Sequence, residues 1–207
     1  MIKTEAAGSI TTITLDRPDK ANALTEAMLR DLIDALDQAM DAAAVILTGT
    51  GRVFSAGADL EAARAGLATS PLWEELSGAV AALPGLSIAA LNGTVAGGAT
   101  GMVLACDLRI AVPQAKFFYP VMKLGFLPQP SDAARMAALI GPARTKWLLV
   151  AGQKITSEQA LLFGLIDEVM PPEELIARAQ ELCADCVAAD PETARAIKAL
   201  CTDRRHK

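Results

Sequence analysis

This sequence of 207 residues contains only four cysteines, one histidine and one tyrosine. The cysteines are too few and too scattered for a disulfide framework in a chain of this length, so we expect them to be reduced. The single histidine, His206, stands in the C-terminal tail, and the Cys183-x-x-Cys186 pair has no second pair. We therefore expect these two cysteines in a helix core, and we predict no zinc, redox or other metal site.

Long apolar runs and basic clusters are also lacking. Although mean hydropathy is +0.33, Gly, Pro or charge interrupts every apolar run short of the roughly 18 residues that span a membrane. The start, Met1 to Glu5, shows no secretory signal, so a cytoplasmic location is predicted. Lys and Arg number 19 against 24 Asp and Glu, and the only basic run is the terminal 204–207. Neither a membrane nor a nucleic-acid partner is expected.

The composition is typical of one globular domain. With 52% hydrophobic and 21% charged residues, a chain of this length can bury a single core over 1–207. Apolar and β-branched runs predict strands, and helical spacing predicts helices. The expected strands are 10–15, which would be the first, 45–48, 86–91 and 108–112, and the expected helices of this half are 25–40 and 99–106. Thr25 is expected to cap the helix over 25–40, and Met40 to lie on its apolar face. This alternation predicts an α/β core over about 1–130.

The remaining part, about 131–207, is predicted to be helical. Ser131 is expected to cap a helix that ends at Gly141, and Pro142 to open the next one. Thr156 begins a capping box for a third helix. Two further helices are expected over 172–189 and 190–201.

Two glycine-rich segments, 54–60 and 92–98, follow predicted strands. Small side chains let a ligand approach the main-chain N–H groups, and the second segment leads into a helix whose N-terminus favours negative charge. Neither segment has Walker spacing or the G-x-G-x-x-G order, so a phosphate loop fits poorly. Together they can hold an oxyanion; the alternative is that their glycines only permit tight turns and close packing.

At this point the residues resemble a known family. The segments concerned are Arg17-Pro18 with Ala21-Asn22-Ala23-Leu24, Ile46 to Gly49, Phe54 to Leu60, Ile88 to Gly93, and Ala105 to Arg109. In order and spacing they look like the crotonase (enoyl-CoA hydratase/isomerase) superfamily. Lys123 to Gly125 and Gly164 to Val169 extend the resemblance over nearly the whole chain.

The resemblance implies an α/β fold, a crotonase-like spiral of β-β-α units with C-terminal helices, assembled as a homotrimer or hexamer. The implied substrate is an acyl-CoA thioester, with coenzyme A as part of the substrate and no permanently bound cofactor. The N–H groups of Ala58 and Gly98 would form an oxyanion hole for a thioester enolate. Coenzyme A binding is assigned to two segments, namely Ala21, Ala23 and Leu24, and Ala56, Gly57, Ala58, Asp59 and Leu60.

Departures from the family pattern concern the acids. Hydratases of the family carry two glutamates at positions that here hold Gly101 and Val121. Some relatives instead use an aspartate four residues beyond the glycine at Gly125, where this chain has Gln129. None of these side chains transfers a proton, so the standard hydration mechanism does not carry over.

Other side chains nearby are candidates for that role. Asp132 and Tyr119 are the first two, although an acid there also complements a helix dipole and a lone tyrosine also fits a core. Lys123 is expected to be a surface charge. Glu74 and Glu75 stand in the segment Pro71 to Ser77. This segment is expected either to be mobile and to bring them to the pocket as a lid, or to be a helical stretch on which they are exposed acids.

Two hypotheses follow. The first is an acyl-CoA enzyme, a lyase or isomerase, that uses Ala58 and Gly98 and an unidentified proton-transfer group. The second is a catalytically silent crotonase-like protein that binds acyl-CoA or serves in assembly. Family members commonly continue past the helix that ends near Asp203, so the closing helices are expected to be absent, with a more open pocket, a different acyl cover or altered trimer packing.

Overall fold

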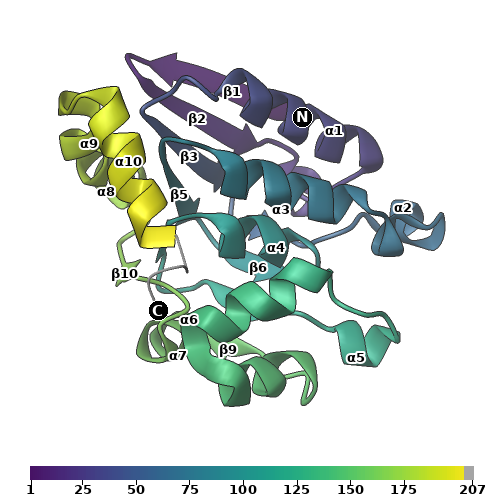
Figure 1. Cartoon of the computed structure of the whole chain (residues 1–207). Coiled ribbons are helices and arrows are strands. Elements are labelled where there is room, and N and C mark those ends of the chain that lie inside the picture. The colour runs from purple at the N-terminus through teal and green to yellow at the C-terminus, as the bar shows by residue number, and fades with distance from the viewer. Residues whose placement is uncertain (203–207) are drawn as a thin grey trace.

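The computed structural model describes residues 1–202 as two β-sheets with helices packed around them (Figure 1). The larger sheet has the order β1-β2-β3-β5-β7-β10, and the smaller sheet has the order β4-β6-β8-β9. The larger sheet consists of β1 (Ile2–Ala7), β2 (Ile10–Leu15), β3 (Ala44–Gly49), β5 (Leu86–Leu91), β7 (Leu108–Ala111) and β10 (Glu168–Val169). The smaller sheet consists of β4 (Val53–Ser55), β6 (Thr94–Ala96), β8 (Lys116–Phe118) and β9 (Ile155–Thr156).

Successive strand pairs divide between the two sheets. β3, β5 and β7 are parallel neighbours in the larger sheet, while β4, β6 and β8 are parallel neighbours in the smaller one. Each pair leads into helices: first α2 (Leu60–Arg64) and α3 (Leu72–Ala82), then α4 (Ala99–Ala105), then α5 (Val121–Leu124). The predicted spiral of β-β-α units is therefore confirmed. Because β4 and β6 run in parallel, the segments that follow them leave the same edge of the sheet.

All four predicted strands are present, but 10–15 is the second strand and not the first. β1 precedes it as an antiparallel edge strand whose residues are mostly exposed, so it shows no apolar run. The strands of the smaller sheet have only two or three residues each. Periodicity cannot reveal segments that short, which is why they were missed.

The core lies between the sheets and the helices. Helix α1 (Glu26–Gln38) begins where the Thr25 hydroxyl accepts a hydrogen bond from Met28 N, as predicted. Its buried side chains lie along one face, but Met40, which was expected on that face, is 39% exposed because the helix ends at Gln38. Helix α4 is almost wholly buried and packs against both α3 and α6 (Pro130–Leu149).

Helix α6 is interrupted at Gly141, whose φ of 78° and ψ of 159° are not helical. The predicted break before Pro142 is thus confirmed. The predicted start is wrong: Gln129 is the N-cap and Pro130 the first helical residue, because proline suits that position. Ser131 instead accepts a hydrogen bond from Arg135 through its hydroxyl.

The helices that follow complete the C-terminal part. Helix α7 (Ser157–Phe163) begins with the predicted capping box at Thr156. The helix expected over 172–189 is divided at Cys183 into α8 (Leu175–Leu182) and α9 (Ala184–Ala188), and α10 (Pro191–Thr202) follows. Short 3-10 turns occur at Pro18–Lys20 and Leu67–Thr69.

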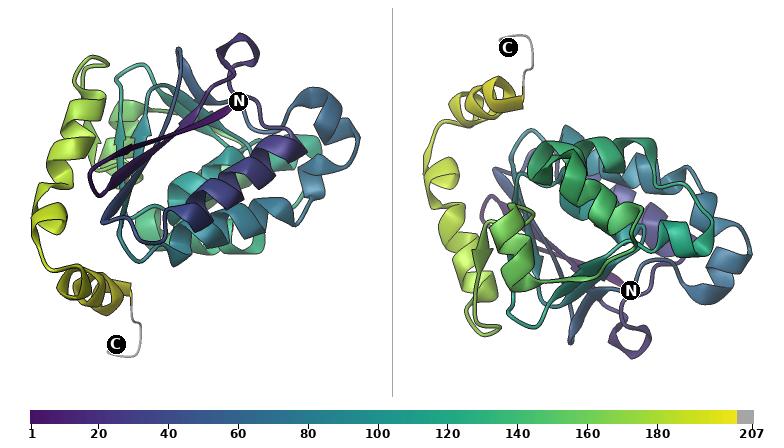
Figure 2. Two further views of the ribbon diagram at one scale, coloured as in Figure 1. Left: turned by 90° about the horizontal axis from the view of Figure 1, so that it is seen from above. Right: turned by 90° about the horizontal axis from the view of Figure 1, so that it is seen from below.

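Helices α8, α9 and α10 lie along one side of the molecule (Figure 2). Lys198 on α10 donates to Gly85 O and forms an ion pair of 2.7 Å with Asp107. These two contacts connect α10 to the loops before β5 and β7. None of the helices in residues 1–202 combines the length and hydropathy that crossing a bilayer requires. The basic tail 204–207, with His206, lies outside the described residues.

Candidate active site

The two glycine-rich segments meet at the shared edge of β4 and β6. Gly57 and Gly97 both have positive φ, 88° and 57°. A Cβ placed on Gly57 would lie 2.8 Å from Ala96 O and 3.4 Å from Gly97 Cα. The two backbones are therefore in contact, and no larger side chain fits between them. The structure brings together the two turns that the sequence singled out.

Two main-chain N–H groups remain available at this junction. Leu24 forms a β-bridge with Ala58, but the hydrogen bonds of this bridge involve the neighbours of Ala58. Leu24 N donates to Gly57 O (2.7 Å), and Leu24 O accepts from Asp59 N (2.8 Å). Within residues 1–202, neither Ala58 N nor Gly98 N donates to a protein acceptor. Both residues are half-buried and line the same cavity, so their unpaired N–H groups are available to a bound oxygen.

A cavity of about 370 Å³ opens over these groups. Ala58 and Gly98 both line it, and its other walls come from α2, from Trp73 and from residues 118–129. The lining is mainly apolar; its only titratable members are Arg64, which is exposed, and Tyr119. The size and character are those of a small-molecule site.

The segments expected to bind coenzyme A divide into lining and supporting residues. Ala56, Ala58 and Leu60 line the cavity. The supporting residues are Ala21, Ala23, Leu24, Gly57 and Asp59. Main-chain hydrogen bonds, such as that from Ala56 N to Ala21 O (3.0 Å), join the segment 21–24 to the segment 56–60. Direct contact of these supporting residues with coenzyme A stays a prediction.

Arg17 holds the two segments together, a role that sequence reasoning missed. Its guanidinium donates to Ala23 O (2.9 Å) and to Asp59 Oδ2 (2.8 Å). Asp59 in turn caps α2, since its Oδ1 accepts from Glu61 N (3.0 Å). The hydrogen bond from Arg17 holds the pKa of Asp59 below its usual value. The only signal for this role was the Arg17-Pro18 pair within the family motif.

Tyr119 in the cavity wall and Asp132 behind it form a buried polar pair. The Tyr119 hydroxyl donates to Asp132 Oδ2 at 3.0 Å. Asp132 is fully buried, and this burial raises its pKa to about 6 even though the Tyr119 bond favours the charged form. Burial, with the adjacent Asp132 carboxylate, also raises the pKa of Tyr119. Asp132 stands in the first turn of α6, where a charge complements the dipole, but its side chain points inward.

The Asp132 carboxylate occupies the space beside Gly101. A Cβ placed on Gly101 would lie 2.7 Å from Asp132 Oδ1, and this oxygen has no hydrogen-bond partner in the described structure. Val121 and Gln129 line the cavity. Gly101 and Val121 stand at the two positions where the family resemblance places glutamates. Gly101 therefore faces a carboxylate from another helix, whereas Val121 makes its part of the cavity wall apolar.

The remaining candidates do not reach the cavity. Glu74 and Glu75 belong to α3, which is the helical alternative, and buried Trp73 and Leu76 anchor this helix to the core. Glu74 accepts a 3.4 Å hydrogen bond from the main chain of α6, Glu75 is exposed, and Lys123 is exposed as predicted.

Trp73 covers Gly98, which the sequence did not indicate. A Cβ on Gly98 would lie 2.8 Å from the indole ring of Trp73. The ring is held because its Nε1 donates to Leu67 O at 2.8 Å. The position of the Gly98 donor thus depends on a close contact between a glycine and a fixed aromatic ring.

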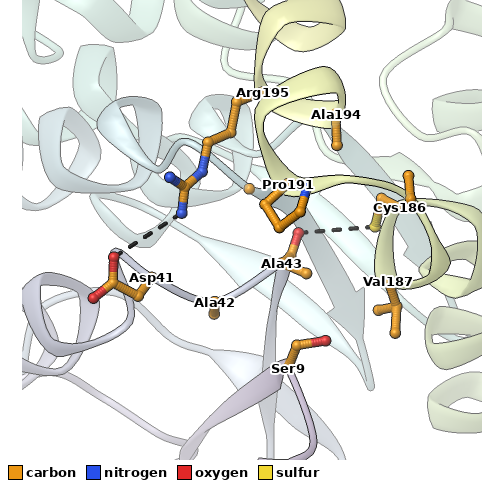
Figure 3. A pocket seen from close by; sticks show the side chains of 11 residues that line it. Ser9, Asp41, Ala42, Ala43, Cys186, Val187, Pro191, Ala194 and Arg195 are labelled. Carbon is orange, nitrogen blue, oxygen red and sulfur yellow. Dashed lines mark hydrogen bonds and ion pairs between the residues drawn. The ribbon is translucent and has the colours of Figure 1, made fainter.

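A second, smaller cavity of about 130 Å³ lies between α9, α10 and the loop before β3 (Figure 3). Arg195 approaches Asp41 at 4.0 Å across it, and the Cys186 thiol lies 3.8 Å from Ala43 O. The thiols of Cys183 and Cys186 donate to helix carbonyls and are not joined to each other. This cavity is a gap where the C-terminal helices meet the loops before β3 and β5, and it shares no lining residue with the larger cavity.

A family model described as enoyl-CoA hydratase/isomerase matches residues 5–205. YngF of Bacillus subtilis (strain 168) is 38% identical over 196 residues, which cover 90% of this chain and 75% of YngF. The short-chain-enoyl-CoA hydratase of Clostridium acetobutylicum is 31% identical over 207 residues, covering 94% of this chain and 78% of that protein.

Solved structures agree with these matches. The crystal structure of an enoyl-CoA hydratase from Bacillus anthracis is 33% identical, with a TM-score of 0.89 over 97% of this chain and 82% of that one. Pseudomonas aeruginosa DspI is 31% identical, with a TM-score of 0.90 over 100% of this chain and 88% of its own. Both share the fold over nearly the whole length described above.

Proposed function

We propose, because the chain belongs to the enoyl-CoA hydratase/isomerase family, that its cavity binds an acyl-CoA thioester and stabilises the enolate of that thioester. The observation that carries this proposal is the pair of free N–H groups of Ala58 and Gly98 in one apolar cavity. Both would donate to the thioester oxygen, on which negative charge grows as the enolate forms. One such donor is typically worth about 3 kcal/mol in the transition state.

The cavity also suits the rest of such a substrate. Its apolar wall between Phe118 and Leu127 fits an acyl chain. The exposed Arg64 supplies a positive charge at its edge, which favours the phosphate groups of coenzyme A. The reaction belongs to the lyase or isomerase classes. A homotrimer or hexamer remains the expected assembly, and the exposed Trp147, Val150 and Leu162 on the outer helices support self-association.

The second candidate function is acyl-CoA binding without turnover. It rests on Gly101 and Val121, which carry no titratable group at the positions where the family resemblance places glutamates. The cavity and its two N–H donors would serve binding equally well. The two candidates differ only in whether a new product forms.

Calorimetric titration with CoA, acetyl-CoA and several enoyl-CoA thioesters, followed by mass spectrometry of each mixture, tests both candidates. A new product supports the enzyme, affinity without product supports the silent binder, and no affinity overturns the proposed site.

The Gly98 donor is tested by a matched pair of variants. Gly98→Pro removes the N–H, and the φ of −60° at this position already suits proline. Gly98→Ala keeps the N–H but adds the same Cβ against Trp73. We expect turnover to fall by roughly 100-fold or more from the alanine to the proline variant. Equal turnover in the two variants would show that this N–H does not contribute.

A further inference from the structure

We propose that Tyr119 and Asp132 together transfer the α-proton of the bound thioester: Tyr119 contacts the substrate, and Asp132 holds the proton behind it. The inference rests on the proposed function, since it needs an acyl-CoA in the cavity. It assigns the proton transfer to two residues on different elements, a loop after β8 and the first turn of α6.

Asp132 has no adequate structural reason to be a buried acid. Only one of its two carboxylate oxygens is hydrogen-bonded, and the other is buried without a partner. The nearest cation on its own helix, Arg135, directs its guanidinium to the Ser131 hydroxyl at 2.7 Å instead. A buried charge with incomplete pairing destabilises the fold, and such groups occur mainly where a reaction requires them.

The neighbouring elements place this carboxylate close to the oxyanion donors. Its unpartnered Oδ1 lies against Gly101 on α4, where the absence of a side chain leaves room for it. Gly101 stands three residues, about one helical turn, after Gly98, which caps the same helix. The helix that presents one oxyanion donor therefore also adjoins the carboxylate.

Within residues 1–202, Tyr119 is the cavity-wall residue whose side chain is hydrogen-bonded to the Asp132 carboxylate. Tyr119 lines the cavity, whereas Asp132 does not. A proton that leaves the substrate thus reaches Asp132 through the Tyr119 hydroxyl. This makes Tyr119 the catalytic residue and Asp132 a positioning residue that acts through it.

The proton balance closes without a further reactant. The Cα–H bond of the thioester breaks, its electron pair moves to the thioester oxygen held by Ala58 and Gly98, and the proton goes to Tyr119 Oη. The original Tyr119 proton passes to Asp132 Oδ2, so Tyr119 stays neutral and Asp132 becomes a neutral acid. Protonation of an enolate follows the same steps in reverse.

The electrostatic surroundings poise this carboxyl group near neutral pH. Three groups face it: Tyr119 by hydrogen bond, Arg135 on α6, and Glu74 on α3. Burial and Glu74 raise its pKa, while Tyr119 and Arg135 lower it, for a result of about 6. An acid with such a pKa is suited to both accept and return a proton.

The test is hydrogen exchange at the α-carbon of butanoyl-CoA. This saturated thioester can form an enolate, so the test does not require the natural substrate to be identified. The protein is incubated with butanoyl-CoA in D2O, deuterium at Cα is followed by mass spectrometry, and binding is measured separately by calorimetry. Wild type is expected to exchange faster as Asp132 ionises, with an inflection near pH 6.

The variants Tyr119→Phe and Asp132→Asn are nearly isosteric. Each is expected to slow exchange by roughly 100-fold or more with unchanged affinity, and Asp132→Asn also loses the inflection. Glu75→Gln, an exposed acid on α3, is the matched control and keeps the wild-type rate. Circular dichroism verifies folding, and if Asp132→Asn does not fold, the Tyr119→Phe rate decides.

The outcomes separate this inference from the proposed function. Wild-type exchange that persists in both variants overturns the Tyr119–Asp132 transfer but leaves the oxyanion site intact. A wild-type protein that binds butanoyl-CoA without exchange overturns enolate formation and the transfer with it. Absence of binding overturns the proposed site itself.

Discussion

Gly101 and Asp132 share one small space although they belong to different helices. The Cβ position of Gly101 lies only 2.7 Å from Asp132 Oδ1, a distance that a real side chain does not tolerate. A glycine inside α4 costs up to about 1 kcal/mol in helix propensity relative to alanine. The glycine is therefore explained by the carboxylate beside it and not by the helix.

A double-mutant cycle tests this pairing. In the wild-type background, Gly101→Ala is expected to lower the free energy of unfolding by about 1–3 kcal/mol, because the new methyl group meets the carboxylate. In the Asp132→Ala background the space is free, so the same change is expected to stabilise the protein slightly through helix propensity. Urea unfolding of the four proteins measures both effects. An equal change in the two backgrounds would mean that Asp132 moves aside at no cost.

The roles of some single residues could be predicted from the sequence, whereas those of others could not. Ala58 and Gly98 were assigned through the family resemblance, and the structure brings their two turns into contact. The inward direction of Asp132 was not predictable, because its contact with Gly101 joins residues 31 positions apart. The residue pattern of α6 alone shows only that Asp132 stands in the first turn of this helix.

Among the elements, the short helix α2 and the loop at 21–24 form the support of the site. Main-chain bonds join the loop to the segment after β4, and Arg17 with Asp59 closes the connection from the side. The positive φ of Ala21 and Asn22 is unusual for these residue types and keeps the loop in its turn. Asn22 is fully buried and donates to Val53 O at 2.7 Å, which fixes the loop to β4.

Removing Asp59 is expected to loosen this support. Asp59→Ala loses both the cap of α2 and the ion pair to Arg17, so the affinity for acyl-CoA is expected to fall by about tenfold as the lining segment loses its fixed position. Calorimetric titration with acetyl-CoA measures this change.

The control is Asp31→Ala, which removes an exposed acid from α1. A similar loss of affinity in both variants would point to net charge and not to the support of the site. The lowered pKa of Asp59 means that its ion pair stabilises the fold above the ordinary carboxyl pKa and is lost as the pH falls below it.

For the molecule as a whole, the buried Asp132 carboxyl couples stability to pH. Its pKa is about 6 in the folded protein against an ordinary value of 3.8, so the folded state binds this proton more tightly than the unfolded chain. Its contribution to the free energy of unfolding is therefore fully present below about pH 4 and is lost as the pH rises to about 6.

Asp132→Asn is expected to remove this dependence. At pH 8 the variant should be more stable than wild type by about 2–3 kcal/mol, and at pH 4 the difference should be small. Denaturant unfolding at the two pH values measures it, with Asp31→Asn as the exposed control. A variant that is less stable than wild type at pH 8 would show that the carboxylate is stabilised by its partners. Greater stability with lower activity is typical of a residue kept for function.

The linear pattern of residues was enough for the four central strands β2, β3, β5 and β7 of the larger sheet, though not for its edge strands β1 and β10. It was also enough for the break at Gly141, the caps at Thr25 and Thr156, and the family with its β-β-α spiral. These features rest on local propensity, on turn chemistry and on motifs that occupy consecutive positions, all of which a sequence displays directly.

Features that depend on contacts between distant segments required the folded structure. The Arg17–Asp59 ion pair, the Trp73 ring over Gly98 and the Tyr119–Asp132 bond each join different elements. Burial is likewise a property of the assembled core: the same aspartate would be an ordinary surface acid if α6 were rotated about its axis. The pKa of Asp132, and with it the proposed proton transfer, arises from packing that no local pattern encodes.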